Sequence, residues 1–145
     1  MKDNLFIIDT NILVYAYDSS DIKKHKKASE LLKSCWEKKK QYAVSLQILS
    51  ELFYVITKKG NKLPYQQAEQ IINDIMDFTY WKKINHDFDT LKLAMQLQLK
   101  VHGYFWDSLI IATMVKNNIN SIYTENVFDF SKYEGINVIN PFDRI

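Results

Sequence analysis

The chain has 145 residues, of which 47% are hydrophobic and 25% are charged, and this composition is typical of one globular domain over residues 1–145. No apolar run reaches the roughly 18 residues that a membrane span needs, and the single cysteine, Cys35, forms no internal disulfide, so we expect a cytoplasmic protein without a membrane partner. The net charge of +2 is too small to indicate nucleic-acid binding by itself.

Short apolar runs alternate with helix-periodic segments along the chain. The apolar run at 5–8 is continuous, as buried strands are, whereas the helical segments repeat their apolar residues at i, i+3 and i+4. The predicted elements are, in chain order, a strand at 5–8, a helix after Asp9, a helix at 22–40, a strand at 42–44, a helix at 45–59, a helix after Pro64, a short edge strand at 81–84, a helix capped by Asp87 that carries Phe88, Leu91, Ala94 and Met95, a helix at 106–116, and strands at 121–123 and 137–139.

This alternation of strands and helices predicts the α/β class. Because parallel strands need crossover helices, we expect a central, mostly parallel sheet of four to five strands with helices on both faces. Ligands of such sheets bind at the carboxyl ends of the strands. Polar residues that directly follow a predicted strand are therefore the first candidates for a functional site.

The segment from Lys23 to Lys40 is rich in lysine. It holds eight lysines against two acids, Glu30 and Glu37. A charged run on a helix is most simply its solvated face, and the same residues could instead form a surface that attracts phosphate groups. The sequence leaves both interpretations open.

Three acids occupy unusual positions. Asp9 ends the first apolar strand, where a carboxylate is costly to desolvate unless a partner offsets its charge. Glu51 flanks the apolar stripe of its helix instead of opposing it, and Asp107 shares a helix face with Ile111 and Met114. Each acid also has an ordinary structural explanation: a helix cap for Asp9, a boundary side chain for Glu51 and a first-turn acid for Asp107.

Further oxygen ligands follow the strand at 121–123. Glu125, Asn126 and Asp129 lie there, and their spacing alone does not separate them. Converging carboxylates raise one another's pKa unless a cation intervenes, and oxygen-only ligands suit Mg²⁺ or Mn²⁺. Such ions activate water and stabilise the displacement at a phosphodiester. The acids therefore predict a divalent-metal site.

Other chemistries have less support. The histidines lack the spacing of zinc ligands, and three glycines in all exclude a glycine-rich phosphate loop. Aromatic residues are core by default, although some could stack on unpaired bases or form a dimer interface; those considered are Phe53, Tyr54, Phe78, Tyr80, Trp81, Tyr104, Phe105 and Trp106.

Four motifs in series resemble those of PIN-domain nucleases, most closely the VapC-type toxins of bacterial and archaeal toxin–antitoxin systems. The closing segment 138–142 is also similar to the last strand of that group. The motifs are Phe6-Ile7-Ile8-Asp9-Thr10-Asn11-Ile12-Leu13, Ser50-Glu51-Leu52, Trp106-Asp107-Ser108-Leu109-Ile110 and Thr124-Glu125-Asn126-Val127-Phe128-Asp129-Phe130.

The resemblance implies a Rossmann-like, metal-dependent ribonuclease. Asp9 and Asp107 would hold Mg²⁺ or Mn²⁺ directly, and Glu51 and Asp129 would bind a second ion or orient the attacking water. For the fourth acid we favour Asp129, with Asn126 and Glu125 as alternatives. The resemblance assigns supporting roles to Thr10, Asn11, Thr124, Glu125 and Asn126.

The same resemblance implies three partners: an RNA substrate, a cognate antitoxin and a second copy of the chain in a homodimer. The nearest alternatives are a stand-alone RNA-processing nuclease and a catalytically decayed module that binds RNA or protein. A haloacid-dehalogenase-like phosphatase is disfavoured, because it would need a second Asp where Asn11 stands.

Overall fold

A computed structural model describes residues 4–143 of the chain. Its centre is a five-stranded sheet in the order β3-β2-β1-β4-β5, in which every pairing between described strands is parallel. The predicted α/β class and sheet are confirmed. The strands are β1 (Phe6–Ile8), β2 (Tyr42–Ser45), β3 (Lys82–Ile84), β4 (Ser121–Tyr123) and β5 (Asn137–Ile139).

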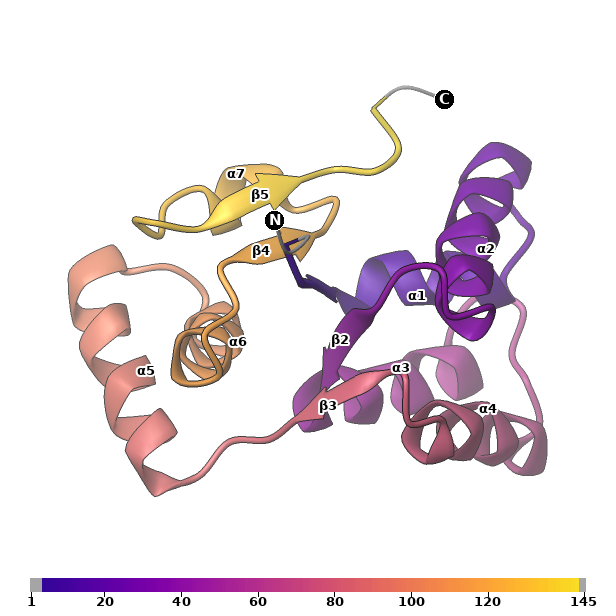
Figure 1. Ribbon diagram of the computed structural model, residues 1–145, viewed down its shortest axis with the longest axis horizontal. Helices are drawn as coiled ribbons and strands as arrows, with labels where there is room; N and C mark the ends of the chain where they lie inside the picture. Colours follow the sequence, from indigo (N-terminus) through magenta and orange to yellow (C-terminus); the bar gives the residue numbers. More distant parts are fainter. Residues whose placement is uncertain (1–3, 144–145) are drawn as a thin grey trace.

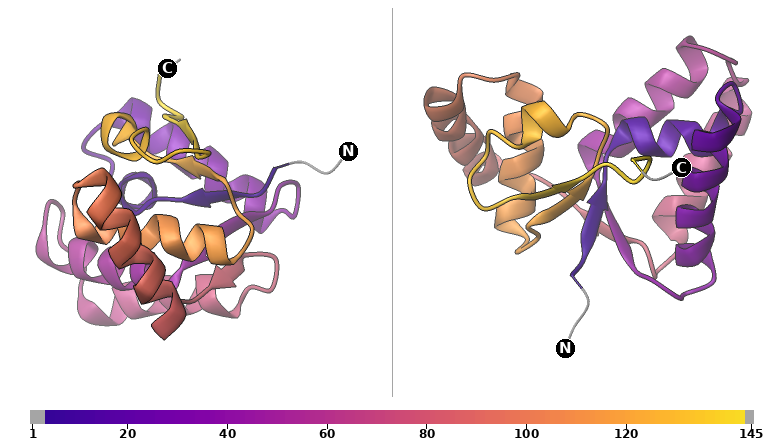
Figure 2. Two further views of the ribbon diagram at one scale, coloured as in Figure 1. Left: turned by 90° about the vertical axis from the view of Figure 1, so that its left-hand side faces the viewer. Right: turned by 90° about the horizontal axis from the view of Figure 1, so that it is seen from above.

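Helices cover both faces of this sheet. Figure 1 shows α5 and α6 on one side and α1, α2 and α4 on the other, and α3 contacts α1 and α4. The right-hand view of Figure 2 shows the same separation from above. The helices are α1 (Thr10–Tyr17), α2 (Ile22–Trp36), α3 (Leu46–Lys58), α4 (Tyr65–Asp77), α5 (Phe88–Val101), α6 (Phe105–Lys116) and α7 (Val127–Phe130).

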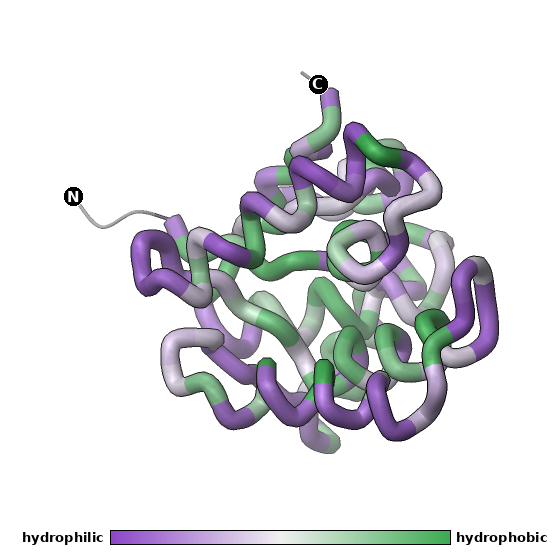
Figure 3. The backbone as a smooth tube through the Cα atoms, turned by 90° about the vertical axis from the view of Figure 1, so that its right-hand side faces the viewer, coloured by the Kyte–Doolittle hydropathy of each residue, from purple (hydrophilic) through white to green (hydrophobic). Residues whose placement is uncertain are grey.

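The core lies between the sheet and these helices. In the central strand β1, Ile7 and Ile8 have no exposed surface, as the continuous apolar run predicts. Figure 3 shows the apolar segments gathered in the interior and the hydrophilic segments around the outside. The buried central strand β1 therefore fixes the position of the polar residues that follow Ile8.

Local capping explains where several helices begin. The Asp9 carboxylate accepts a hydrogen bond from the backbone N–H of Thr10 and caps α1. Ser45 ends β2 and its hydroxyl caps α3. At α5, Asp87 and Thr90 form a reciprocal capping box, which satisfies two backbone groups that the first turn leaves free.

The prediction of a helix over 22–40 is wrong at its C-terminal end. α2 ends at Trp36, and Lys38 adopts a left-handed backbone with φ of 58°. The backbone N–H groups of Lys38 and Lys39 donate to Cys35 and Ser34, a type of closure that satisfies the last carbonyls of a helix. Residues 38–40 are all lysines, so another helical turn would bury no apolar side chain and would gain no stability from packing.

The helix capped by Asp87 forms as predicted, but not all of its apolar residues pack in the core. Ala94 is buried, whereas Phe88 is 87% exposed and Met95 is 48% exposed.

The short helix α7 forms where the sequence indicated only a polar segment after β4. Among residues 4–143, no helix combines the length and apolar character that a membrane crossing requires.

Candidate active site

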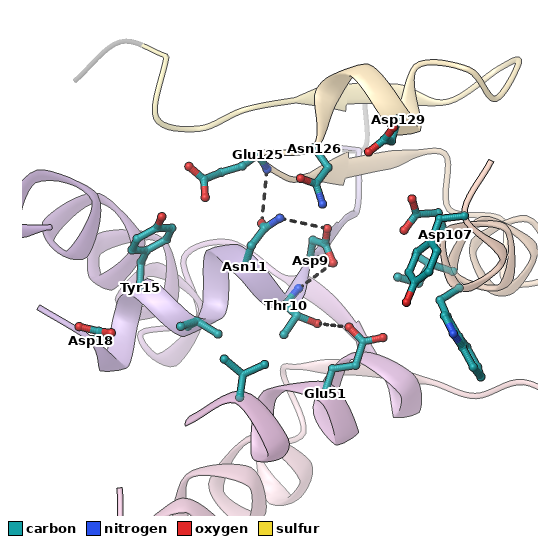
Figure 4. Close-up of a pocket in the computed structure, with 15 residues that line it drawn as sticks. Asp9, Thr10, Asn11, Tyr15, Asp18, Glu51, Asp107, Glu125, Asn126 and Asp129 are labelled. Atoms are coloured by element: carbon teal, nitrogen blue, oxygen red, sulfur yellow. Dashed lines mark hydrogen bonds between the residues drawn. The ribbon is translucent and has the colours of Figure 1, made fainter. Parts of the chain in front are cut away.

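The strand order brings the predicted polar residues to one edge of the sheet. β1 lies between β2 and β4, so the segments that follow these three strands are neighbours. A cavity of about 550 Å³ opens there (Figure 4). It is lined by Asp9, Thr10, Asn11, Val14, Tyr15, Asp18, Glu51, Val55, Tyr104, Trp106, Asp107, Ile110, Glu125, Asn126 and Asp129.

Asp9 lies at the floor of this cavity and is only 5% exposed. The Thr10 backbone N–H donates to Oδ1 at 2.8 Å, and the Thr124 hydroxyl donates to Oδ2 at 2.7 Å. Asn11 Nδ2 makes a longer contact of 3.5 Å with Oδ2. These donors hold the carboxylate in one orientation although water scarcely reaches it.

Thr124 is fully buried and connects two strands of the site. Its hydroxyl also accepts a hydrogen bond from the Asn126 backbone N–H at 3.0 Å. The Glu125 backbone N–H donates to Asn11 Oδ1 at 3.4 Å. The end of β4 is therefore connected to the start of α1 by Thr124 and Asn11, to which the family resemblance assigns supporting roles.

Glu51 reaches the cavity from α3. Its Oε2 accepts a hydrogen bond from the Thr10 hydroxyl, and its Oε1 accepts one from Gln47 Nε2, both at 3.0 Å. Gln47 Nε2 also donates to the backbone carbonyl of Trp106 at 3.0 Å. Gln47 thus links α3 to the first turn of α6.

Asp107 and Asp129 line the opposite wall (Figure 4). Asp107 stands in the first turn of α6, and Asp129 belongs to α7. Asp129 forms an exposed ion pair with Lys132 at 3.6 Å. Within residues 4–143, the Asp107 carboxylate has no hydrogen-bond donor, so its rotation is less restricted than that of Asp9.

Burial and crowding perturb two of these acids. Burial raises the pKa of Asp9 to about 6, although the hydrogen bonds from Thr124 and Thr10 work in the opposite direction. The pKa of Asp107 also rises to about 6, first because of burial and then because of the negative charges of Asp9, Asp129 and Glu51. Perturbed carboxylates in a shared cleft are typical of functional sites.

Glu125 also lines the cavity, but its carboxylate points away from Asp9 and Asp107 (Figure 4). Its Oε2 accepts a hydrogen bond from Lys24 Nζ at 2.6 Å. The same ammonium lies over the rings of Tyr15 and Phe142, at 5.2 and 5.6 Å from their centroids. Lys24 is thus one lysine of the 23–40 run that is not simply solvated.

The structure adds residues that the motifs did not indicate. Gln47 sits one turn before Glu51, and this i, i+4 spacing is the signal that could have predicted its contact. Lys24 pairs with Glu125 across 101 positions, and no local spacing indicates such a pair. The aromatic residues also divide: Trp81 is fully buried, whereas Tyr104 and Trp106 are exposed at the cavity rim.

The donors around the cavity fit a hard divalent cation by their chemistry. All the candidate ligands are oxygen atoms, as Mg²⁺ and Mn²⁺ prefer. A cation would relieve the repulsion among the acids, which adds to the effect of burial in raising the pKa of Asp107. Across the described part of the chain, no three His, Cys, Asp or Glu side chains stand close enough together to hold an ion. The cavity fits a metal provided that the less restrained Asp107 and Asp129 turn inward.

The fold and cavity define a class: a parallel α/β domain with an acidic site at the carboxyl edge of its sheet. The PIN domain family model matches residues 6–136. The chain therefore belongs to the PIN-domain family, a family of nucleases, as its motifs predict. A search of curated proteins found no match.

Solved structures share this fold. The sarcin–ricin-loop-cleaving toxin VapC20 of Mycobacterium tuberculosis is 19% identical, with a TM-score of 0.66 over 87% of this chain and 92% of that chain. A toxin–antitoxin complex from Klebsiella pneumoniae is 23% identical, with a TM-score of 0.65 over 94% and 97%. VapBC2 from Rickettsia felis, bound to a promoter DNA fragment, is 22% identical, with a TM-score of 0.65 over 94% and 98%.

Proposed function

We propose that this chain is a Mg²⁺- or Mn²⁺-dependent endoribonuclease and the toxin of a toxin–antitoxin pair. One observation carries the proposal: acids from four separate elements line a single cavity at the carboxyl edge of the sheet. They are Asp9 at the end of β1, Glu51 on α3, Asp107 on α6 and Asp129 on α7.

In this proposal Asp9 and Asp107 hold the ion, and Asp9 does so from a rigid position. Glu51, held by Thr10 and Gln47, orients the attacking water and accepts a hydrogen bond from it. A bound Mg²⁺ or Mn²⁺ would supply positive charge for the phosphate oxygens and lower the pKa of that water. We place Asp129 as the fourth acid, because the Glu125 carboxylate is already paired with Lys24.

The proposed partners have separate support. VapC20 and the toxin–antitoxin complexes share the fold of this chain, which supports an RNA substrate and an antitoxin. An apolar stripe on α5 lies open to solvent, and such a stripe supports a homodimer. It comprises Phe88, Leu91, Met95 and Leu99.

The test measures cleavage of end-labelled RNA with Mn²⁺ and with EDTA. Asp9→Asn keeps the shape of the side chain but loses the charge, so we expect the fold to persist and cleavage to fall by more than roughly 100-fold, because loss of a partner of a metal ligand already costs about 10–100-fold. The matched control is Asp77→Asn, an exposed acid at the end of α4, which should cleave like the native chain. Undiminished Mn²⁺-dependent cleavage by Asp9→Asn would refute the assignment.

A rival function is binding without catalysis, and the spread of the acids is the observation that favours it. Calorimetry with Mn²⁺ separates the two. A nuclease site binds the ion in the native chain and not in Asp9→Asn, whereas a decayed site gives no binding heat in either.

A further inference from the structure

A lysine of α2 forms an ion pair with one acid of the cavity. Lys24 Nζ donates to Glu125 Oε2 at 2.6 Å, and the two side chains are only 31% and 23% exposed. Glu125 belongs to the lining of the acid cavity, and Lys24 reaches it from outside that lining. A short, charge-assisted hydrogen bond that is partly screened from water is stronger than an ordinary surface ion pair. It therefore fixes the direction of the Glu125 carboxylate.

The Lys24 ammonium is also held by two aromatic rings. It lies 5.2 Å from the ring centroid of Tyr15 and 5.6 Å from that of Phe142, and these rings pack edge to face with their centroids 5.3 Å apart. The face of an aromatic ring attracts a cation. Because Phe142 is buried and follows β5, the segment after the last strand helps to hold the ammonium in place.

The backbone around Lys24 is anchored as well. The Lys24 N–H donates to Oδ1 of Asp21, the cap of α2, at 3.1 Å, and His25 Nδ1 donates to the backbone carbonyl of Tyr15 at 2.7 Å. These hydrogen bonds connect the first turn of α2 to α1, the helix that Asp9 caps. The position of the ammonium relative to the acid cavity is thus set by the packing of two helices.

Without its ion pair, the Glu125 carboxylate would be within reach of the proposed metal site. The Glu125 backbone N–H donates to Asn11 Oδ1 at 3.4 Å, and Asn11 Nδ2 contacts Asp9 Oδ2 at 3.5 Å. One amide group therefore separates the Glu125 backbone from the Asp9 carboxylate. Figure 4 shows the Glu125 carboxylate directed away from Asp9, and rotation about the side-chain bonds would turn it toward the ion.

An inward turn of Glu125 would change the properties of the site. The cavity already contains many carboxylates, and the acids in its lining are Asp9, Asp18, Glu51, Asp107, Glu125 and Asp129. A further carboxylate ligand would strengthen cation binding, because the number of charged ligands tunes the affinity of such a site. It would also occupy a position that the attacking water or the phosphate group needs.

We propose that Lys24 is a positioning residue that holds the Glu125 carboxylate out of the metal site. The inference rests on the proposed function, which supplies the ion. Lys24 thereby decides which acids complete the site and leaves room beside the ion for substrate.

The first experiment measures Mn²⁺ binding by calorimetry for the native chain, Lys24→Met, Glu125→Gln and the double variant. Methionine keeps an unbranched side chain against the two rings and removes the charge. We expect Lys24→Met to bind Mn²⁺ at least roughly 5-fold more tightly, because it gains a charged ligand. Glu125→Gln and the double variant should both bind like the native chain.

The matched control is Lys23→Met, which removes the same charge from an exposed lysine in the same helical turn and should bind Mn²⁺ like the native chain. If the lost charge acted only at a distance, Glu125→Gln would weaken binding by a factor similar to the gain in Lys24→Met, and high salt would remove that gain. Either result would overturn the inference.

The second experiment measures steady-state cleavage of RNA with Mn²⁺. Lys24→Met should bind the ion more tightly and yet have a kcat about 10-fold lower, the lower value for loss of a residue that orients a metal ligand. Adding Glu125→Gln should restore kcat. An ion pair that only stabilises the fold would instead lower the Mn²⁺ affinity, the cleavage rate and the thermal midpoint together, which contradicts a positioning role.

The outcomes separate this inference from the proposed function. If Lys24→Met binds Mn²⁺ more tightly and Glu125→Gln reverses the gain, but no variant cleaves RNA, Lys24 positions Glu125 and the nuclease proposal is wrong. If the native chain cleaves RNA and Lys24→Met has the native Mn²⁺ affinity, the nuclease proposal stands and the inference is wrong. Absence of Mn²⁺ binding by the native chain contradicts both.

Discussion

Asp9 and Glu51 each accept hydrogen bonds from buried or half-buried donors, whereas Asp107 and Asp129 on the opposite wall are held far more loosely. The first pair is fixed by Thr10, Thr124 and Gln47 at 2.7–3.0 Å. Asp129 has only an exposed ion pair with Lys132, which contributes little free energy at a surface. The cavity thus has a rigid wall and an adjustable wall.

This difference explains how the protein can fold although several acids line one cavity. Hydrogen bonds stabilise the charge of Asp9 against the cost of burial, so the rigid wall tolerates a carboxylate that is nearly inaccessible. If the chain binds a cation as proposed, the adjustable wall would let Asp107 and Asp129 stay apart in the metal-free protein and approach each other around the ion. Four rigid, converging carboxylates would destabilise the metal-free fold more strongly.

The largest effect that sharpens the comparison is expected for Asp107→Asn. Cleavage should fall by more than roughly 100-fold, because a proposed metal ligand is lost. In EDTA the thermal midpoint should stay equal or rise, since the raised pKa of Asp107 shows that its charge is disfavoured in the fold. Scanning calorimetry in EDTA checks this, and a marked fall in the midpoint would mean that Asp107 is held as firmly as Asp9.

An intermediate effect is expected for Thr124→Val, which keeps the shape but removes the donor to Asp9. We expect Mn²⁺ affinity and cleavage to fall by about 10–100-fold, the range for partners that orient a metal ligand. Thr113→Val is the control, because Thr113 is also buried and its hydroxyl bonds only within α6. Equal losses in both variants would argue against a rigid wall built around Asp9.

The smallest effect is expected for Glu125→Gln, since the carboxylate of Glu125 is already paired with Lys24. Cleavage should change by less than about 5-fold, which corresponds to about 1 kcal/mol, the upper value for ion pairs in contact with solvent; Lys24 and Glu125 are partly exposed. Asp129→Asn should reduce cleavage more than Glu125→Gln under the same conditions. The reverse order would make Glu125 the fourth acid and move the adjustable wall to β4.

The sequence predicted the sheet and most helices because their signals are local. A continuous apolar run predicted the buried strand β1, short strand-like segments predicted the other four strands, and caps such as Asp87 predicted helix starts. The prediction failed at the end of α2, where a left-handed Lys38 closes the helix. Such a closure depends on backbone geometry. Glycine or asparagine would have indicated it in the sequence, whereas a lysine does not.

By itself, the sequence determined the residue types of the candidate site and their order, because the position of an acid after an apolar run or beside an apolar stripe can be recognised from the sequence alone. Only the tertiary structure decided which oxygen atoms are held and which are free. Thr124 and Asp9 lie 115 positions apart, and Lys24 and Glu125 lie 101 apart. These contacts exist because β1 and β4 are neighbours in the sheet and α1 packs on α2, and hydrogen bonds across that distance follow from packing, which no local pattern encodes.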